Sequence, residues 1–191
     1  SGKAEQHAGR PFVEIERGGG CGRCIQVCPQ AAVTLVEGRA RFNPERCVGC
    51  GDCMRSCDLG AIEFDWTTEI RPFIERVCEY ALGAVRDKPG RVGYINFLLA
   101  ITPDCDCVPW SDAPIVPDIG ILASTDPVAI DHASLDLVNS ERGLARTALG
   151  ENLAPGEDKF KGIWDYTDGN YQIAYAARIG LGDASYRLIE V

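Results

Sequence analysis

Apolar residues recur at different spacings along the chain, and each spacing predicts a different element. Residues 67–85 ("TTEIRPFIERVCEYALGAV") are apolar at every third or fourth position, which predicts an amphipathic helix. Thr67 or Thr68 would cap this helix, and Pro72 would fall near its first turn, where proline is tolerated. The continuous apolar run "RVGYINFLLAI" (91–101) instead predicts a buried strand.

The same alternation of elements continues to the end of the chain. We expect a strand at 115–124, a helix at 124–141, irregular chain at 143–169, a helix at 170–180 and a strand at 186–191. Ser124 or Thr125 would cap the helix at 124–141. Asp126 would lie in its first turn and Pro127 near its first helical position. Strands that alternate with helices predict an α/β domain for residues 67–191.

The earlier part of the chain contains an internal repeat. A shift of 29 residues lays "CPQAAVTL" (28–35) over "CDLGAIEF" (57–64), and each copy runs into a strand-like alternation. Three cysteines of the first copy coincide with three of the second under this shift, namely Cys21, Cys24 and Cys28 with Cys50, Cys53 and Cys57. The second copy begins with Cys47, whereas the first has Gly18 at that place.

Two- and three-residue gaps between cysteines are typical of an iron–sulfur loop. They let the chain curl around a cluster with backbone N–H groups aimed at its sulfurs, and the interleaved glycines allow positive φ angles. Structural zinc sites more often place two Cys-x2-Cys pairs a dozen or more residues apart. Cysteines this close together cannot all pair in disulfides with one another, which favours metal ligation in a reducing, cytoplasmic compartment.

With these motifs, residues 11–66 resemble a bacterial two-cluster 4Fe-4S ferredoxin domain. The resemblance implies that the last cysteine of each run crosses to the other cluster. One cluster would be held by Cys28, Cys47, Cys50 and Cys53. The other would be held by Cys21, Cys24 and Cys57, because Gly18 offers no ligand. That second cluster would be 3Fe-4S, or 4Fe-4S completed from elsewhere.

The fold that we expect is therefore α+β, with a ferredoxin-like two-cluster iron–sulfur domain followed by an α/β domain. The first domain would span residues 1–66, including a lead-in segment at 1–10, and the second 67–191. Asp58 stands where proline follows the last cysteine of the first run. A carboxylate beside an anionic cluster should lower its potential, so Asp58→Asn should raise it.

Residues 79–139 and the tail 171–191 resemble the C-terminal half of the DUF362 family, above all in "TPDCDC" and "ILASTDPVAID". Proteins of this family are of uncharacterised function and often carry a ferredoxin-type insert before this segment. Members also have an α/β portion upstream of the cluster motifs. The resemblance therefore implies that the chain is a C-terminal piece, or that an upstream α/β portion is a partner.

Cys105 and Cys107 lie two residues apart in a loop rich in proline and aspartate, so an extended chain would present both thiols on one side. Three interpretations remain open. The thiols are idle, they form a redox pair that the neighbouring aspartates disfavour, or they bind metal. In the last case, Cys105 or Cys107 would complete the cluster that Gly18 leaves open.

The other candidate residues have simpler explanations. Cys78 lies on the apolar face of the predicted helix and is expected in the core. His132 is expected to be solvated or hydrogen-bonded, and His7 idle. Asp118, Asp126 and Asp131 share the family-like stretch, where Asp126 would be a helix cap or first-turn charge and Asp131 could face a pocket.

Composition limits the classes of partner. Asp and Glu number 28 against 19 Lys and Arg, a net charge of −9, which argues against nucleic acid. No apolar run approaches the length of a membrane span. We expect an electron-transfer protein that passes single electrons to or from a redox partner protein. The alternative is a reductase-type enzyme, an oxidoreductase. Its substrate would react at the open cluster or at a metal bound by Cys105 and Cys107, and both functions stay open at this point.

Overall fold

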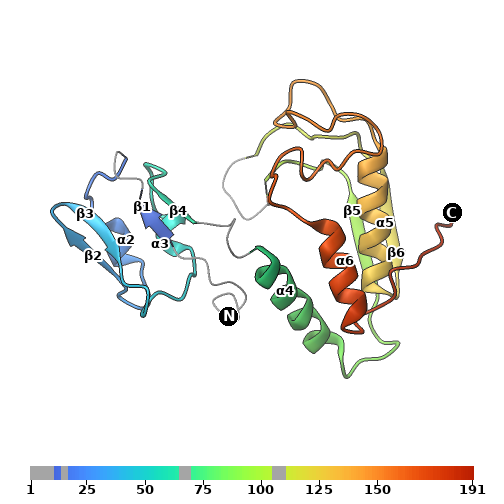
Figure 1. Cartoon of the computed structure of the whole chain (residues 1–191), viewed down its shortest axis with the longest axis horizontal. Helices are drawn as coiled ribbons and strands as arrows, with labels where there is room; N and C mark the ends of the chain where they lie inside the picture. Colours follow the sequence, from blue (N-terminus) through green and yellow to red (C-terminus); the bar gives the residue numbers. More distant parts are fainter. Residues whose placement is uncertain (1–10, 14–16, 65–69, 105–110) are drawn as a thin grey trace. The chain divides into compact units, whose positions relative to one another are not determined.

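A computed structural model describes residues 11–13, 17–64, 70–104 and 111–191. The chain forms two compact units, Ser1–Arg76 and Val77–Val191. Helices and small antiparallel sheets occur in the chain, as expected for the α+β class (Figure 1). The predicted division after residue 66 falls in a segment outside the described residues and stays a prediction. In the described parts, no helix has the length and apolar character needed to cross a membrane.

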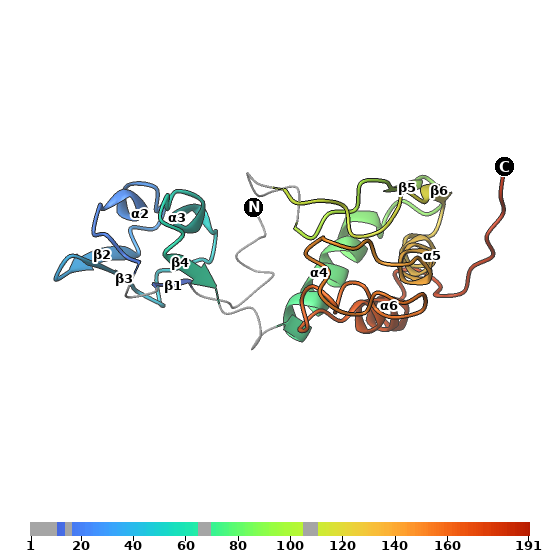
Figure 2. The ribbon, with the colours of Figure 1, turned by 90° about the horizontal axis from the view of Figure 1, so that it is seen from above.

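The N-terminal unit combines two short helices with two small sheets. Its elements are β1 (Pro11–Val13), α2 (Arg23–Gln26), β2 (Val33–Val36), β3 (Arg39–Phe42), α3 (Asp52–Arg55) and β4 (Ile62–Phe64). β1 pairs antiparallel with β4, and β2 with β3. Figure 2 shows α2 and α3 next to each other on one side of the two sheets. The strands β2 and β4 are those predicted at the end of each repeat copy.

The backbone of this unit follows the sequence repeat. Each short helix begins directly after a glycine in the left-handed conformation, Gly22 with φ 74° and Gly51 with φ 79°. A side chain would strain the chain at these positions, which explains why both copies keep glycine there. Ala31 and Gly60, at matching places before β2 and β4, also have positive φ. The repeat is therefore a structural one and not only a pattern of letters.

Two cysteines belong to the core of the N-terminal unit. Its buried apolar cluster consists of Cys24, Val33, Cys53 and Ile62. Cys24 and Val33 come from the first copy and Cys53 and Ile62 from the second, at equivalent positions of the 29-residue repeat. Each copy thus contributes one helix cysteine and one strand side chain, and neither buries them without the other.

The C-terminal unit is built on the antiparallel pair β5 (Tyr94–Leu98) and β6 (Gly120–Ser124). Helix α4 (Ile70–Val85) enters the unit, and α5 (Pro127–Ser140) and α6 (Gly169–Arg178) lie on the same side of the sheet (Figure 2). Side chains from the sheet, its flanking loops and α5 form the main core cluster, which consists of Leu98, Ile115, Val116, Val138 and Leu149. The predicted helix at 170–180 is confirmed as α6, and the one at 67–85 is confirmed as α4 from Ile70 onward; its expected start, with Thr67 or Thr68 as cap, lies outside the described residues.

The prediction of a buried strand at 91–101 is wrong for one face of β5. On the face toward α5, Asn96 Nδ2 donates to Asp131 Oδ1 at 3.0 Å and to Ser134 Oγ at 2.9 Å. On the opposite face Ile95 and Phe97 are 60% and 63% exposed, and Ile121 on β6 is 59% exposed. Helix α5, which contacts both strands, and α6, which contacts α5, lie on its other side, so this apolar face has no cover among the described elements.

Two further expectations need correction. Helix α5 begins at Pro127 with Asp126 as its N-cap, and not with Ser124 or Thr125. No strand forms at 186–191; the described chain there has no partner strand. Two side-chain hydrogen bonds instead attach the chain around residues 184–186 to α5. His132 Nδ1 donates to the Ala184 carbonyl at 2.7 Å, and the Tyr186 hydroxyl donates to Asp136 Oδ2 at 2.7 Å.

The long irregular segment predicted at 143–169 is confirmed, and a buried lysine organises it. Lys159 is fully buried, and its Nζ donates to the carbonyls of Asn139, Ala154 and Glu157 at 3.2, 2.7 and 2.9 Å. Burial lowers the pKa of Lys159, since it disfavours the charged form. Three carbonyl acceptors satisfy the ammonium group and tie the loop to the end of α5.

Candidate functional site

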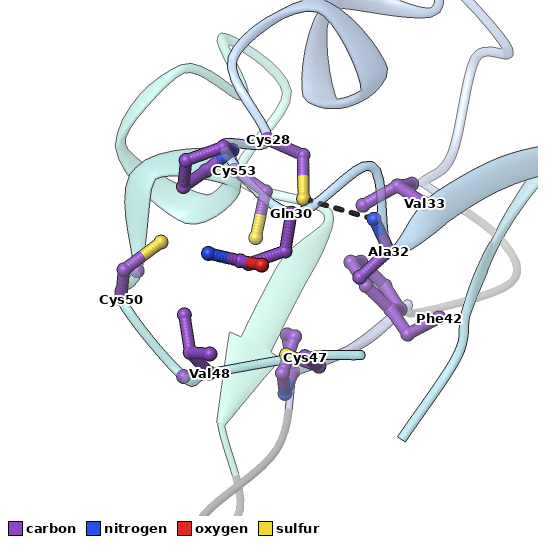
Figure 3. A pocket seen from close by; sticks show the side chains of 13 residues that line it. Cys28, Gln30, Ala32, Val33, Phe42, Cys47, Val48, Cys50 and Cys53 are labelled. Atoms are coloured by element: carbon purple, nitrogen blue, oxygen red, sulfur yellow. Dashed lines mark hydrogen bonds between the residues drawn. The ribbon is translucent and has the colours of Figure 1, made fainter. Parts of the chain in front are cut away.

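Two cavities in the N-terminal unit divide its seven cysteines between them. The first is lined by the thiol-bearing residues Cys28, Cys47, Cys50 and Cys53 (Figure 3). The second is lined by Cys21, Cys24 and Cys57, together with the glycines from Gly18 to Gly20 and Gly22. Each cavity takes cysteines from both repeat copies, since Cys28 joins the second copy and Cys57 joins the first. The structure therefore brings together the same two groups of cysteines that the resemblance to two-cluster ferredoxins implied.

The two cavities are alike in size and in character. They contain about 330 Å³ and about 360 Å³ of empty space, including the part open to solvent. Apart from cysteine and glycine, apolar side chains dominate both walls, such as Val33 and Phe42 in the first and Leu35 and Leu59 in the second. Apolar walls exclude water and strengthen electrostatic interactions inside. The two cavities are thus comparable in size and in the character of their walls.

Backbone N–H groups point at the crossing cysteine of each run. Ala32 N–H donates to Cys28 Sγ at 3.2 Å, and Ala61 N–H donates to Cys57 Sγ at 3.4 Å. In both copies the donor is four residues after the sulfur, directly before the first residue of β2 or β4. Hydrogen bonds of this kind stabilise a thiolate and tune the potential of a cluster bound to it. They are present in the second cavity as well as in the first.

Burial raises the pKa of Cys24, and that of Cys53 to about 11. For Cys53 the backbone N–H of Met54 opposes this shift, and the nearby thiols Cys50 and Cys47 add to it. Both groups are therefore thiols at neutral pH in the metal-free chain. A bound metal centre deprotonates a coordinating thiol, which makes the same buried sulfurs suitable ligands.

In the described parts of the chain, no three His, Cys, Asp or Glu side chains converge closely enough to hold one metal ion. This does not conflict with the cavities, because a four-iron cluster takes one thiolate on each of four iron atoms. Its ligands therefore surround a larger body than one zinc ion. Seven thiols around two cavities fit that donor arrangement, with one position lacking at Gly18.

Asp58, predicted to lie beside the second cluster, is paired with Arg23 of α2. Both side chains are largely exposed, and the pair joins the end of the second cysteine run to the first. The guanidinium offsets part of the field of the carboxylate, which the sequence alone did not indicate. Gln30 is a second residue that the sequence did not single out; it lines the first cavity with the thiols (Figure 3).

The other candidates take structural positions or lie outside the described residues. Cys105 and Cys107 lie outside them, as does His7. Cys78 is buried, and its Sγ contacts the Gln172 carbonyl at 3.8 Å in the C-terminal unit. Asp118 Oδ1 accepts the N–H of Ala100 at 2.7 Å. This hydrogen bond stabilises the left-handed conformation of Ala100, shortly after β5.

Asp131 does face a cavity, in the C-terminal unit. This cavity lies between α4, α5 and α6 and is lined by Cys78, Asp131 and Gln172 among mainly apolar side chains. Asp131 also accepts the hydrogen bond from Asn96. Burial, with the nearby carboxylates Asp131 and Glu79, raises the pKa of Cys78, so this thiol is protonated and a poor nucleophile.

A family model described as "Domain of unknown function (DUF362)" matches residues 1–136, which is most of the chain. The chain belongs to the DUF362 family. The matched residues include both cysteine runs and end within α5, so the DUF362 domain contains both cysteine-lined cavities. The tail at 171–191, which also resembles the family, lies outside the match. No curated protein matches this DUF362 chain.

Proposed function

We propose that this protein is an iron–sulfur electron-transfer protein that carries two 4Fe-4S-type clusters in its N-terminal unit. The observation that supports this most is the division of seven cysteines over two similar cavities. Cys28, Cys47, Cys50 and Cys53 would hold one cluster, and Cys21, Cys24 and Cys57 the other. Bound in these positions, the clusters would accept and release single electrons.

The residues of the chain have distinct parts in this function. The thiols bind, the glycines at 20, 22, 49 and 51 let the backbone approach, and the N–H groups of Ala32 and Ala61 stabilise sulfur charge. In the first cavity, apolar walls limit the access of water to the bound group. The net charge of −9 suits a redox partner protein with a basic docking surface.

Iron and sulfide counts with EPR on anaerobically reconstituted protein test this proposal. We expect about eight iron atoms per chain when both clusters are complete, and EPR signals from two reduced clusters. Cys53→Ser should lose the signal of the cluster in the first cavity. Cys78→Ser is the matched control, since it changes a buried cysteine outside both cavities, and it should leave the spectra unchanged. Zinc in a colourless protein would refute the proposal.

A further inference from the structure

The two cysteine-lined cavities differ most clearly at one ligand position. Under the 29-residue repeat, Cys21, Cys24 and Cys57 have thiol counterparts, whereas Gly18 takes the place of Cys47. The cavity at Gly18 is nevertheless as large as its counterpart, and its crossing cysteine keeps the N–H donor. The second cavity has thus kept its form while it lacks one ligand.

Among the described residues that line the second cavity, the side chains besides the three cysteines are apolar. They belong to Val13, Leu35, Ala40, Leu59, Ala61 and Ile62. None of these can coordinate iron. A cluster bound there would therefore have one iron atom to which the described lining residues provide no ligand.

This position lies at the surface. Cys21 is exposed, whereas its counterpart Cys50 is partly buried. Gly18 itself is partly exposed, and it is not among the glycines with positive φ. A small molecule can therefore reach the corner of the cavity at Gly18, and a cysteine placed there would meet no backbone strain.

We propose that the Gly18 corner of the second cavity binds a small thiolate from solution, in the coordination position that Cys47 supplies in the first cavity. This rests on the proposed clusters. The ligand class follows from the preference of cluster iron for soft sulfur donors and from the apolar wall. The nearby charged side chains contribute little to the choice of ligand, because Arg17 is paired with Glu63 and Arg23 with Asp58.

A titration with 2-mercaptoethanol, followed by EPR of the reduced protein, tests this site. In the wild type we expect one of the two cluster signals to shift saturably while the other stays unchanged. Gly18→Cys should abolish the shift, because the new thiol takes the position. Cys47→Gly creates the same gap in the first cavity, so both signals should then respond.

Several outcomes would overturn the inference while leaving the proposed function intact. One is a full iron count with two signals that the thiol does not change. Another is a response that appears only after Cys105→Ser with Cys107→Ser, which would show that one of these cysteines already fills the position. A protein that binds no iron would refute the proposed function itself, and the Gly18 site with it.

Discussion

Asp126 makes three hydrogen bonds that join the start of α5 to the chain beyond α6. Its Oδ1 accepts the N–H groups of Val128 and Ala129 at 2.8 and 3.0 Å, and its Oδ2 accepts that of Asp183 at 2.8 Å. Gly182 lies directly against this carboxylate, where an added Cβ would come within 2.2 Å of Oδ1. The contact therefore needs a residue without a side chain at position 182.

Gly182→Ala should lower the free energy of unfolding by about 1–3 kcal/mol, because the methyl group displaces the carboxylate from its N–H donors. Asp126→Ala should cost a similar amount, and the double variant less than the sum, since both remove one contact. Gly150→Ala, where nothing lies within 4 Å, should change stability by less than about 0.5 kcal/mol. Urea unfolding followed by circular dichroism measures all four variants; strictly additive losses would contradict the coupling.

At the residue scale, the cysteine runs could be located from the sequence, whereas the helix caps could not all be assigned. The spacing and the repeat identified the cysteine runs, and the grouping of Cys28 with Cys47, Cys50 and Cys53 around one cavity is the one that the resemblance to two-cluster ferredoxins implied. The cap of α5 could not be assigned to one residue, because Ser124, Thr125 and Asp126 are all good capping types. Ser124 turned out to support the cap, since its Oγ accepts the N–H of Asp126 at 3.0 Å.

At the element scale, the strands show the limit of pattern reasoning. β5 has apolar residues on both faces, a pattern typical of a strand buried on both sides. The structure covers only the face that carries Asn96 and Leu98, and leaves Ile95 and Phe97 exposed. Which face is covered depends on the number of layers around the sheet, and that number is a property of the assembled unit.

The ion pair between α2 and the turn after α3 gives a prediction at this scale. Asp58→Asn should raise the midpoint potential of the cluster proposed for the second cavity, because it removes a negative charge near Cys57. Arg23→Gln should lower the same potential, and the double variant should lie near the wild type. A redox titration measures these shifts, with Glu151→Gln in the C-terminal unit as the unaffected control. Shifts of equal sign for both single variants would contradict the prediction.

At the scale of the whole molecule, the two units have cores of different kinds. The C-terminal unit has an apolar cluster that includes Leu98, Ile115 and Val138. Half of the buried cluster in the N-terminal unit consists of cysteines, Cys24 and Cys53. A small unit whose described core has so few buried apolar side chains needs a further source of folding stability, and a bound metal centre can supply it.

Removal of iron from the proposed clusters with a chelator should therefore unfold the N-terminal unit and leave the C-terminal unit folded. Hydrogen exchange with mass spectrometry measures this directly: amides of β2 and β4 should lose protection, while those of α5 and α6 keep it. In the variant Trp66→Phe with Trp110→Phe, Trp164 is the only tryptophan left, and its fluorescence reports on the C-terminal unit. This fluorescence should stay unchanged when iron is removed. Amides in β2 and β4 that stay protected without iron would contradict this dependence.

The exchange of cysteines between the two repeat copies has a consequence for ancestry. Cys28 completes a cavity whose other thiols belong to the second copy, and Cys57 completes one that belongs to the first. A chain with a single copy would lack the crossing ligand at its own cavity. It would obtain that ligand only from a second molecule, in a two-fold symmetric dimer in which each partner lends its last cysteine. Duplication within one gene would then have joined the two partners, and only after that was Gly18 free to differ from Cys47.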